Sequence, residues 1–207
     1  MSPRPYQSPR RTVGATKTRE RVVKSAAAIL SSSDGIRGFS LEAVARKAGV
    51  TRLTVYNHFG SRRALLEAVF DRTATMGGLH RIGEVMAASS DPQSALLRIV
   101  EIFCEFWSFA PTTIGLLHSA GASDPEFEAS VHERNERRRQ ILCVLVERMA
   151  AGHDIKPREI GNLVDVLFAL TSFHFFAQLI AGKRTAAEAC GLIRGLVMDA
   201  VKRVTRA

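Results

Sequence analysis

The stretch around Tyr56 brings together side chains that can hydrogen-bond to nucleic acid. Arg52 and Asn57 carry hydrogen-bonding groups that match the edges of bases. Thr54, Tyr56 and His58 can hydrogen-bond to phosphate oxygens. The stretch contains no Asp or Glu, whose negative charge would repel phosphate. These residue types therefore predict a surface that contacts DNA.

Two short helices are expected to position these side chains. Ser40 is a typical N-cap residue, and Gly49 is expected to end the first helix in the left-handed conformation. Thr51 then caps a second helix that runs to about Phe59. Two short helices joined by a glycine-containing turn form a helix-turn-helix, whose second helix lies in the major groove of DNA. The sequence therefore predicts this motif.

The positive charge of the chain is concentrated in the same region. Residues 1–63 hold 13 of the 29 Lys and Arg residues and 3 of the 20 Asp and Glu residues, a net charge of +10. The rest of the chain carries 16 basic and 17 acidic residues, which nearly cancel. A basic module attached to a neutral one fits a protein that meets the phosphate backbone with one of its parts. A merely basic, solvated N-terminus is the alternative.

The basic region resembles the N-terminal domain of TetR-type repressors. The pattern of that family combines an Ala-Gly-Val-Ser/Thr turn, a Thr-x-Tyr-x-His-Phe recognition helix and a Ser-Lys-x-x-Leu start of the next helix. The corresponding residues here are Ala48-Gly49-Val50-Thr51, Thr54-Val55-Tyr56-Asn57-His58-Phe59 and Ser61-Arg62-Arg63-Ala64-Leu65. The rest of the chain matches the family only in length and helical layout.

The resemblance implies a role for each residue of this surface. Phosphate contacts are implied for Thr51, Thr54, Tyr56, His58 and Arg62. Base contacts are implied for Arg52, Leu53 and Asn57. Arg62 replaces the usual lysine and retains the ability to bind phosphate, whereas Leu53 stands where glycine is common and leaves the base preference open. A core position for Tyr56 and a packing or capping role for His58 are the alternatives.

An all-α fold of about nine helices is expected, because no segment shows the period-two alternation of a strand. Residues 1–16, which contain three Pro and three Arg, are expected to form a flexible basic arm. Residues 17–63 form a three-helix DNA-binding domain that begins with a helix from about Thr18 to Ser32. Residues 64–207 form a helical ligand-binding and dimerisation domain. The Gly77-Gly78 pair is expected to kink or divide the helix that starts at Ser61.

A homodimer is expected, because one helix-turn-helix reads one half-site and paired half-sites lie about 34–36 Å apart or a multiple of that spacing. The last two expected helices, Pro157–Ala181 and Thr185–Val204, carry apolar stripes at helical spacing. By resemblance, these helices of two copies form a four-helix bundle on a double-stranded DNA operator. Ordinary packing within one chain is the alternative for one side of each helix.

An effector pocket is expected in the C-terminal domain. Aromatic, sulfur-containing and imidazole side chains are candidates for its lining: Phe103, Cys104, Phe106, Trp107, His118, Cys143, Phe173, His174 and Phe176. Phe and Trp with a few polar groups suit a small apolar or aromatic ligand. The resemblance implies that such an effector releases the repressor from DNA. Plain core packing is the alternative for each of these residues.

Two other classes of protein compete with this interpretation. An enzyme is disfavoured, because no Gly-rich phosphate loop, G-x-S-x-G, H-E-x-x-H or C-x-x-C motif occurs, so no catalytic residue, metal or cofactor is expected. A nonspecific, architectural DNA-binding protein would share the basic N-terminal region. Such a protein would not need a neutral, aromatic-rich domain of this size.

The chain is expected to be cytoplasmic and to have no membrane partner. Its first residues, MSPRPYQSPRR, contain no apolar signal segment. The most apolar window, residues 163–180, includes Asp165, His174 and Gln178, whereas a membrane span needs about 20 nearly uninterrupted apolar residues. The three cysteines lie far apart in the sequence, which fits reduced thiols.

Overall fold

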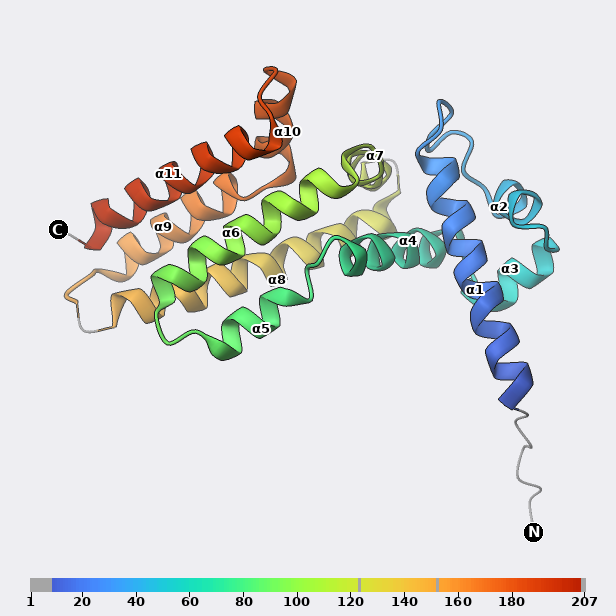
Figure 1. Ribbon diagram of the computed structural model, residues 1–207, viewed down its shortest axis with the longest axis horizontal. Coiled ribbons are helices and arrows are strands. Elements are labelled where there is room, and N and C mark those ends of the chain that lie inside the picture. The colour runs from blue at the N-terminus through green and yellow to red at the C-terminus, as the bar shows by residue number, and fades with distance from the viewer. Residues whose placement is uncertain (1–8, 123, 152, 206–207) are drawn as a thin grey trace, which may run out of the picture.

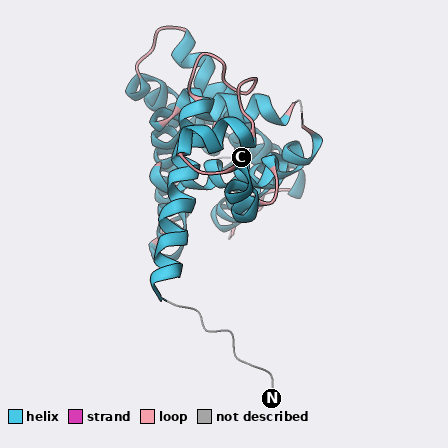
Figure 2. Cartoon of the chain, turned by 90° about the vertical axis from the view of Figure 1, so that its right-hand side faces the viewer, coloured by secondary structure: helices cyan, strands magenta, loops and turns pink. Residues whose placement is uncertain are grey.

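The computed structural model describes residues 9–122, 124–151 and 153–205. Within these ranges the chain forms eleven helices and no strands (Figure 2). The first four are α1 (Pro9–Leu30), α2 (Leu41–Ala48), α3 (Arg52–Phe59) and α4 (Arg62–Met76). The others are α5 (Arg81–Ala88), α6 (Pro92–Phe109), α7 (Pro111–Gly121), α8 (Pro125–Ala150), α9 (Pro157–Leu170), α10 (Phe173–Ala181) and α11 (Ala186–Thr205). The all-α prediction is confirmed, with more helices than expected.

The molecule is elongated, with α1, α2 and α3 at one end and the longer helices at the other (Figure 1). The fourth helix, α4, joins the two parts. It packs against α1 and α3 at its N-terminal side and also against α7 and α8. A displacement of α4 would therefore change packing contacts in both parts of the molecule.

Helix α1 begins at Pro9 and not near Thr18. The flexible arm expected over residues 1–16 is therefore wrong for residues 9–16, and residues 1–8 lie outside the described ranges. The reason lies in helix cooperativity. Val22, Ala26 and Leu30 in the second half of α1 are fully buried. A helix that forms there can grow toward the N-terminus, because each added residue contributes one hydrogen bond.

The helix expected from Pro157 to Ala181 is broken into α9 and α10, which meet at an angle of 47°. The break falls at two residues whose hydroxyl groups hydrogen-bond to the backbone. Thr171 Oγ1 donates to the carbonyl oxygen of Leu167 at 2.8 Å, and Ser172 Oγ accepts from the Phe175 N–H at 3.1 Å. Only α9 and α11 then remain as long, adjacent helices at the C-terminal end.

Helix α4 ends where it meets α6. A Cβ atom at Gly77 would lie 2.6 Å from Cδ2 of Phe106, so only glycine permits this approach. The expected division of the helix at Gly77-Gly78 is confirmed, because α5 begins as a separate helix at Arg81. The close approach places the end of α4 beside the aromatic side chains of α6.

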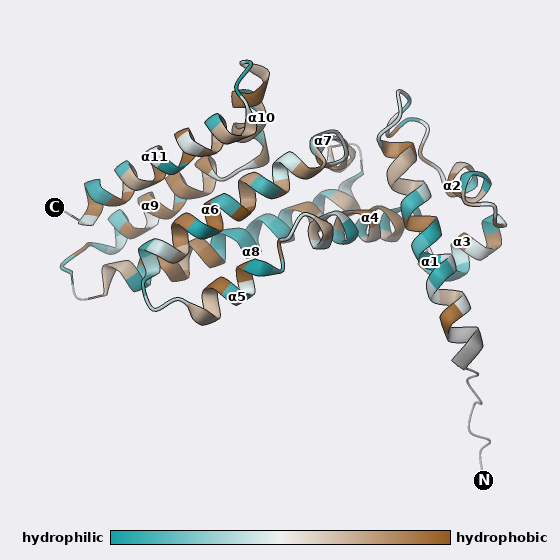
Figure 3. Ribbon diagram, viewed as in Figure 1, coloured by the Kyte–Doolittle hydropathy of each residue, from teal (hydrophilic) through white to brown (hydrophobic). Residues whose placement is uncertain are grey.

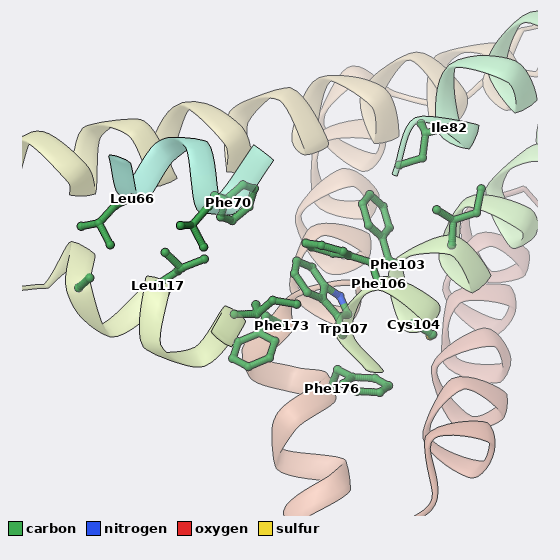
Figure 4. Packing of buried hydrophobic residues seen from close by; sticks show 14 of the residues in the cluster. Leu66, Phe70, Ile82, Phe103, Cys104, Phe106, Trp107, Leu117, Phe173 and Phe176 are labelled. Carbon is green, nitrogen blue, oxygen red and sulfur yellow. The ribbon is translucent and has the colours of Figure 1, made fainter. Parts of the chain in front are cut away.

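The core of the larger part centres on α6, whose aromatic side chains point into it (Figure 4). Phe106 and Phe127 are the largest fully buried side chains. Helix α8, by contrast, is hydrophilic over much of its length (Figure 3). Among the described residues, no single helix has the length and composition to cross a membrane, although the bent pairs α6 with α7 and α9 with α10 meet those criteria together.

Candidate nucleic-acid interface and cavity

The turn between α2 and α3 has the geometry expected of a helix-turn-helix. Ser40 Oγ accepts from the Ala43 N–H at 3.1 Å and caps α2. Gly49 ends α2 at φ 63° and ψ 42°, in the left-handed region where a Cβ atom is costly. The Val50 N–H then returns to the Ala45 carbonyl oxygen at 3.0 Å, as in a Schellman motif. Local hydrogen bonds therefore fix the angle between the two helices.

One side of α3 is anchored and the opposite side faces solvent. Val55 and Phe59 are buried, and the Arg19 guanidinium of α1 lies 5.0 Å from the centre of the Phe59 ring. The exposed side presents four of the predicted DNA-contacting residues: Arg52, Leu53, Tyr56 and Asn57. Leu53 is 66% exposed and Tyr56 is 55% exposed, so Tyr56 is not a core aromatic residue.

The remaining α3 candidates lie around this exposed side. Thr51 Oγ1 caps the helix by accepting from the Thr54 N–H at 3.1 Å, and the two hydroxyl oxygens are 2.9 Å apart. His58 is half-buried, with its ring centre 6.2 Å from that of Phe59. The three side chains therefore border the exposed face, and Thr51 also caps the helix.

The guanidinium of Arg62, a predicted phosphate ligand, contacts other residues of the chain in this structure. Its Nη1 atom is 3.4 Å from Oδ2 of Asp124, and its Nε donates to the Phe39 carbonyl oxygen at 3.3 Å. Asp124 is also the N-cap of α8, where its Oδ1 accepts from the Phe127 N–H at 3.2 Å. Arg62 thus joins the first turn of α4 to the start of α8.

A cavity of about 490 Å³ lies between α4, α5, α6 and α8. Four predicted pocket residues line it: Phe103, Phe106, Trp107 and His118. Phe70 of α4 and Ile82 of α5 contribute to its apolar wall, beside the α6 rings in Figure 4. The indole Nε1 of Trp107 donates to the Thr171 carbonyl oxygen at 3.1 Å, which fixes the ring in the wall.

The other predicted pocket residues do not line this cavity. Cys104 follows Phe103 by one residue and therefore points away, toward Cys190 in a groove between α6 and α11. Cys143 lies on another face of α8 and contacts Glu147. On α10, Phe173 and Phe176 are buried behind the wall, and the exposed His174 lies against His118. Of the nine candidate residues, the structure therefore brings four together in one cavity and places five elsewhere.

His118 is held as a neutral imidazole. Its ring stacks on Phe173 at 5.3 Å between centres and lies 5.2 Å from the His174 ring. Burial, followed by the proximity of His174 and Arg138, lowers the pKa of His118 to about 4. A neutral imidazole in the wall can donate or accept a hydrogen bond at physiological pH.

The sequence analysis missed the charged part of the cavity wall, which α8 and α4 supply: Asp71, Arg134, Arg137 and Arg138. The arginines recur at positions three and four residues apart in the run 134–138, followed by Ile141, which is the spacing of one helix face. That spacing was a usable signal. Among the described residues, no three His, Cys, Asp or Glu side chains are grouped so as to hold a metal ion.

Arg134 and Arg137 have carboxylate partners, and Arg138 has none among the described residues. Arg134 Nη2 is 2.6 Å from Asp71 Oδ1, and Arg137 Nη2 is 3.1 Å from Glu133 Oε1. Arg138 is 7% exposed, and its Nη1 donates to the Phe168 carbonyl and to Thr171 Oγ1, both at 3.1 Å. Burial, with the neighbouring charge of Arg139, lowers the pKa of Arg138 to about 10.

Exposed hydrogen-bonding side chains on the second helix of a helix-turn-helix define a class of protein that binds DNA. Residues 25–69 match the family described as bacterial regulatory proteins, tetR family. This match includes both helices of the helix-turn-helix, so over this segment the chain is similar to tetR-family regulatory proteins.

Two transcriptional regulators have similar sequences over part of their length. The chain is 29% identical over 110 residues to the HTH-type transcriptional regulator EthR of Mycolicibacterium smegmatis, covering 53% of this chain and 51% of that protein. It is 40% identical over 55 residues to the uncharacterized regulator TtgW of Pseudomonas putida, covering 27% and 40%. The chain thus spans about half or less of the length of these relatives.

The fold is also found in solved structures. A TetR-like transcriptional regulator from Rhodococcus sp. RHA1 superposes with a TM-score of 0.67 at 18% identity, over 87% of this chain and 93% of that one. At that identity the likeness concerns the fold, from the helix-turn-helix to the C-terminal helices.

Proposed function

We propose that this protein is a ligand-responsive repressor that binds a palindromic operator as a homodimer and is released by a small effector. One observation carries the proposal: α4 directly follows the recognition helix and also supplies Phe70 and Asp71 to the cavity wall. A molecule in the cavity therefore contacts the helix that holds the DNA-binding domain. Such a molecule changes DNA binding if it binds more tightly to the protein with α4 in one position than in another.

The DNA-reading part of the proposal assigns base contacts to the exposed face of α3 and phosphate contacts to its borders. Arg52, Leu53 and Asn57 are exposed and are free to reach base edges. Phosphate contacts are assigned to Thr51, Thr54, Tyr56, His58 and Arg62. The Arg62 contact requires that a phosphate replace Asp124 as the partner of the guanidinium.

This assignment can be tested on an operator selected from random DNA. The wild-type protein should prefer the operator over random DNA by a factor of about 10³ or more at physiological salt. Asn57→Ala should lower discrimination at particular base pairs, by about 1–3 kcal/mol. Arg62→Ala should weaken binding to all sequences alike and reduce the salt slope by about one. Binding measured by fluorescence anisotropy at two salt concentrations separates these outcomes.

Equal affinity of the wild-type protein for operator and random DNA would instead indicate a nonspecific binder. A change of sequence preference in Arg62→Ala would contradict the phosphate assignment. Uniform weakening in Asn57→Ala would contradict the base assignment. Circular dichroism of each variant checks that the helices are retained.

The dimer is proposed to form through α9 and α11. An apolar groove with a charged rim runs between these helices, lined by Leu163, Val166, Leu170, Leu196, Ala200 and Val204. Val166 is 45% exposed and Leu196 is 37% exposed, although both are apolar. A second copy of the chain would cover these side chains and bring two recognition helices into one complex.

Val166→Arg tests this interface, because it places a charge in the groove. We expect a monomer in sedimentation velocity and a loss of operator affinity. Val144→Arg is the matched control, since Val144 is 43% exposed on α8 and does not line the groove. The interface would be wrong if Val166→Arg stayed dimeric or if both variants dissociated equally.

A further inference from the structure

Arg138 carries a buried positive charge that no described carboxylate neutralises. Its Nη1 hydrogens are used by two uncharged acceptors, and its guanidinium lies 4.1 Å from the centre of the Phe168 ring. Nε is the one buried side-chain nitrogen or oxygen among the described residues without a hydrogen-bond partner. Leaving such a donor unpaired costs about 1–3 kcal/mol, and more for a charged group.

The unused atoms form one edge of the guanidinium. Nη1 lies on the side of Cδ, so the N–H of Nε and one N–H of Nη2 point in parallel along the opposite edge. No hydrogen bond from Nη2 is found in the part of the chain that the structure describes. Two parallel N–H groups are the arrangement that a carboxylate accepts with both oxygens.

The surroundings of Arg138 favour an anion over a neutral or cationic group. The cavity wall contains three arginines and one aspartate, and that aspartate, Asp71, is already paired with Arg134. His118 is neutral and adds no positive charge. A cation would be repelled, and a neutral ligand would leave the charge of Arg138 unbalanced.

The rest of the cavity fits an apolar body attached to that anion. Phe103, Phe106 and Trp107 provide a continuous aromatic wall on α6, and Phe70 faces it from α4 (Figure 4). The volume of about 490 Å³ lies within the range of about 300–1,000 Å³ usual for small-molecule sites. A charged end and an aromatic wall therefore lie within one cavity.

We propose that the effector is a small organic carboxylate whose apolar or aromatic body packs on the α6 wall and whose carboxylate binds the guanidinium of Arg138. This inference rests on the proposed function only in taking the same cavity as the effector site. It narrows the small apolar or aromatic effector suggested by the sequence to an amphipathic anion.

The test compares acids with alcohols of the same carbon skeleton. The probes are 4-phenylbutyrate with 4-phenylbutan-1-ol, and decanoate with decan-1-ol. Trp107 is the one tryptophan of the chain and lines the cavity, so its fluorescence reports binding without DNA. Calorimetry gives the affinity independently. We expect each acid to bind at least about tenfold more tightly than its alcohol, the value of a charge-assisted pair.

Arg138→Met should remove this preference, because methionine retains an apolar stem without the charge. Arg138→Lys should retain only part of it, since lysine lacks the paired N–H edge. Arg137→Met is the matched control, because Arg137 lines the same cavity but is 61% exposed and paired with Glu133. It should change acid affinity by less than about fivefold.

Equal affinities of acid and alcohol for the wild-type protein would overturn the inference, and that comparison needs no variant. Equal losses in Arg137→Met and Arg138→Met would also overturn it, because a general positive field would then explain the preference. Failure of all four probes to bind would overturn it as well. Operator affinity is measured on the same samples, so a protein that binds DNA but no acid fails only this inference.

Discussion

The hydrogen bonds that cap α2, α3 and α4 join residues three positions apart, whereas those of Arg138 and Trp107 in the cavity wall join residues 30–64 positions apart. Ser40, Thr51 and Ser61 each bond to a backbone N–H in the next turn. Trp107 instead bonds to Thr171. The DNA-binding part is therefore specified within short stretches of sequence, and the cavity depends on the packing of the whole C-terminal part.

The largest expected effect on stability is at a residue that contacts residues far from it in the sequence. Phe106→Ala removes a fully buried ring that contacts both Phe70 and Trp107. We expect the free energy of unfolding to fall by about 3–5 kcal/mol, measured by urea denaturation. Leu53→Ala, at an exposed position of α3, should change it by about 0.5 kcal/mol or less. A loss below about 1 kcal/mol for Phe106→Ala would contradict the comparison.

A pH dependence should come from His118 in the cavity wall. Burial lowers the pKa of His118 to about 4, below the value of about 6.5 in the unfolded chain. The unfolded state then binds the extra proton first, so stability is full above pH 6.5 and is lost as the pH falls toward 4. The loss should reach about 3 kcal/mol. His118→Phe keeps an aromatic ring that does not titrate. It should reduce the difference in unfolding free energy between pH 7 and pH 4.5. An unchanged difference would assign the pH dependence to other groups.

The smallest effect should be at a local turn. Gly49→Ala places a Cβ atom in the left-handed region and should cost about 1–2 kcal/mol of stability. Gly14 lies in an exposed part of α1, where an added Cβ atom would meet nothing within 4 Å outside the backbone of its own helix. Gly14→Ala should therefore stabilise the protein by about 0.5–1 kcal/mol. Thermal denaturation compares the two. If Gly49→Ala cost more than Phe106→Ala, local turns would dominate the stability and the comparison would be reversed.

The sequence separation of these contacts also explains which structural features could be predicted from the sequence. Ser40, Gly49 and Thr51 were predicted as caps and turn because their partners lie within five residues. The break at Thr171 was missed, because an apolar stripe continues across it and only the hydroxyl contacts show the bend.

The cavity was predicted by residue type and was only partly correct. Phe103 and Trp107 line it, but their neighbour Cys104 faces α11 because each helical residue turns away from the last. The Arg run of α8 could have been assigned to one helix face. The absence of a carboxylate beside Arg138 could not be predicted, because its contacts come from Phe168 and Thr171 at the end of α9, about 30 residues further along the chain.

Arg62 has one guanidinium and two competing uses. Asp124 contacts it in this structure, so under the proposed function a phosphate exchanges with that carboxylate when the DNA contact forms. This exchange adds a step to the association rate. Asp124→Asn retains an oxygen for the cap of α8 and releases Arg62, so we expect faster association in stopped-flow measurements, whereas an unchanged rate would exclude the step. Under the proposed function, a phosphate that takes Arg62 from Asp124 removes this contact between α4 and α8, so operator binding and effector binding would be coupled.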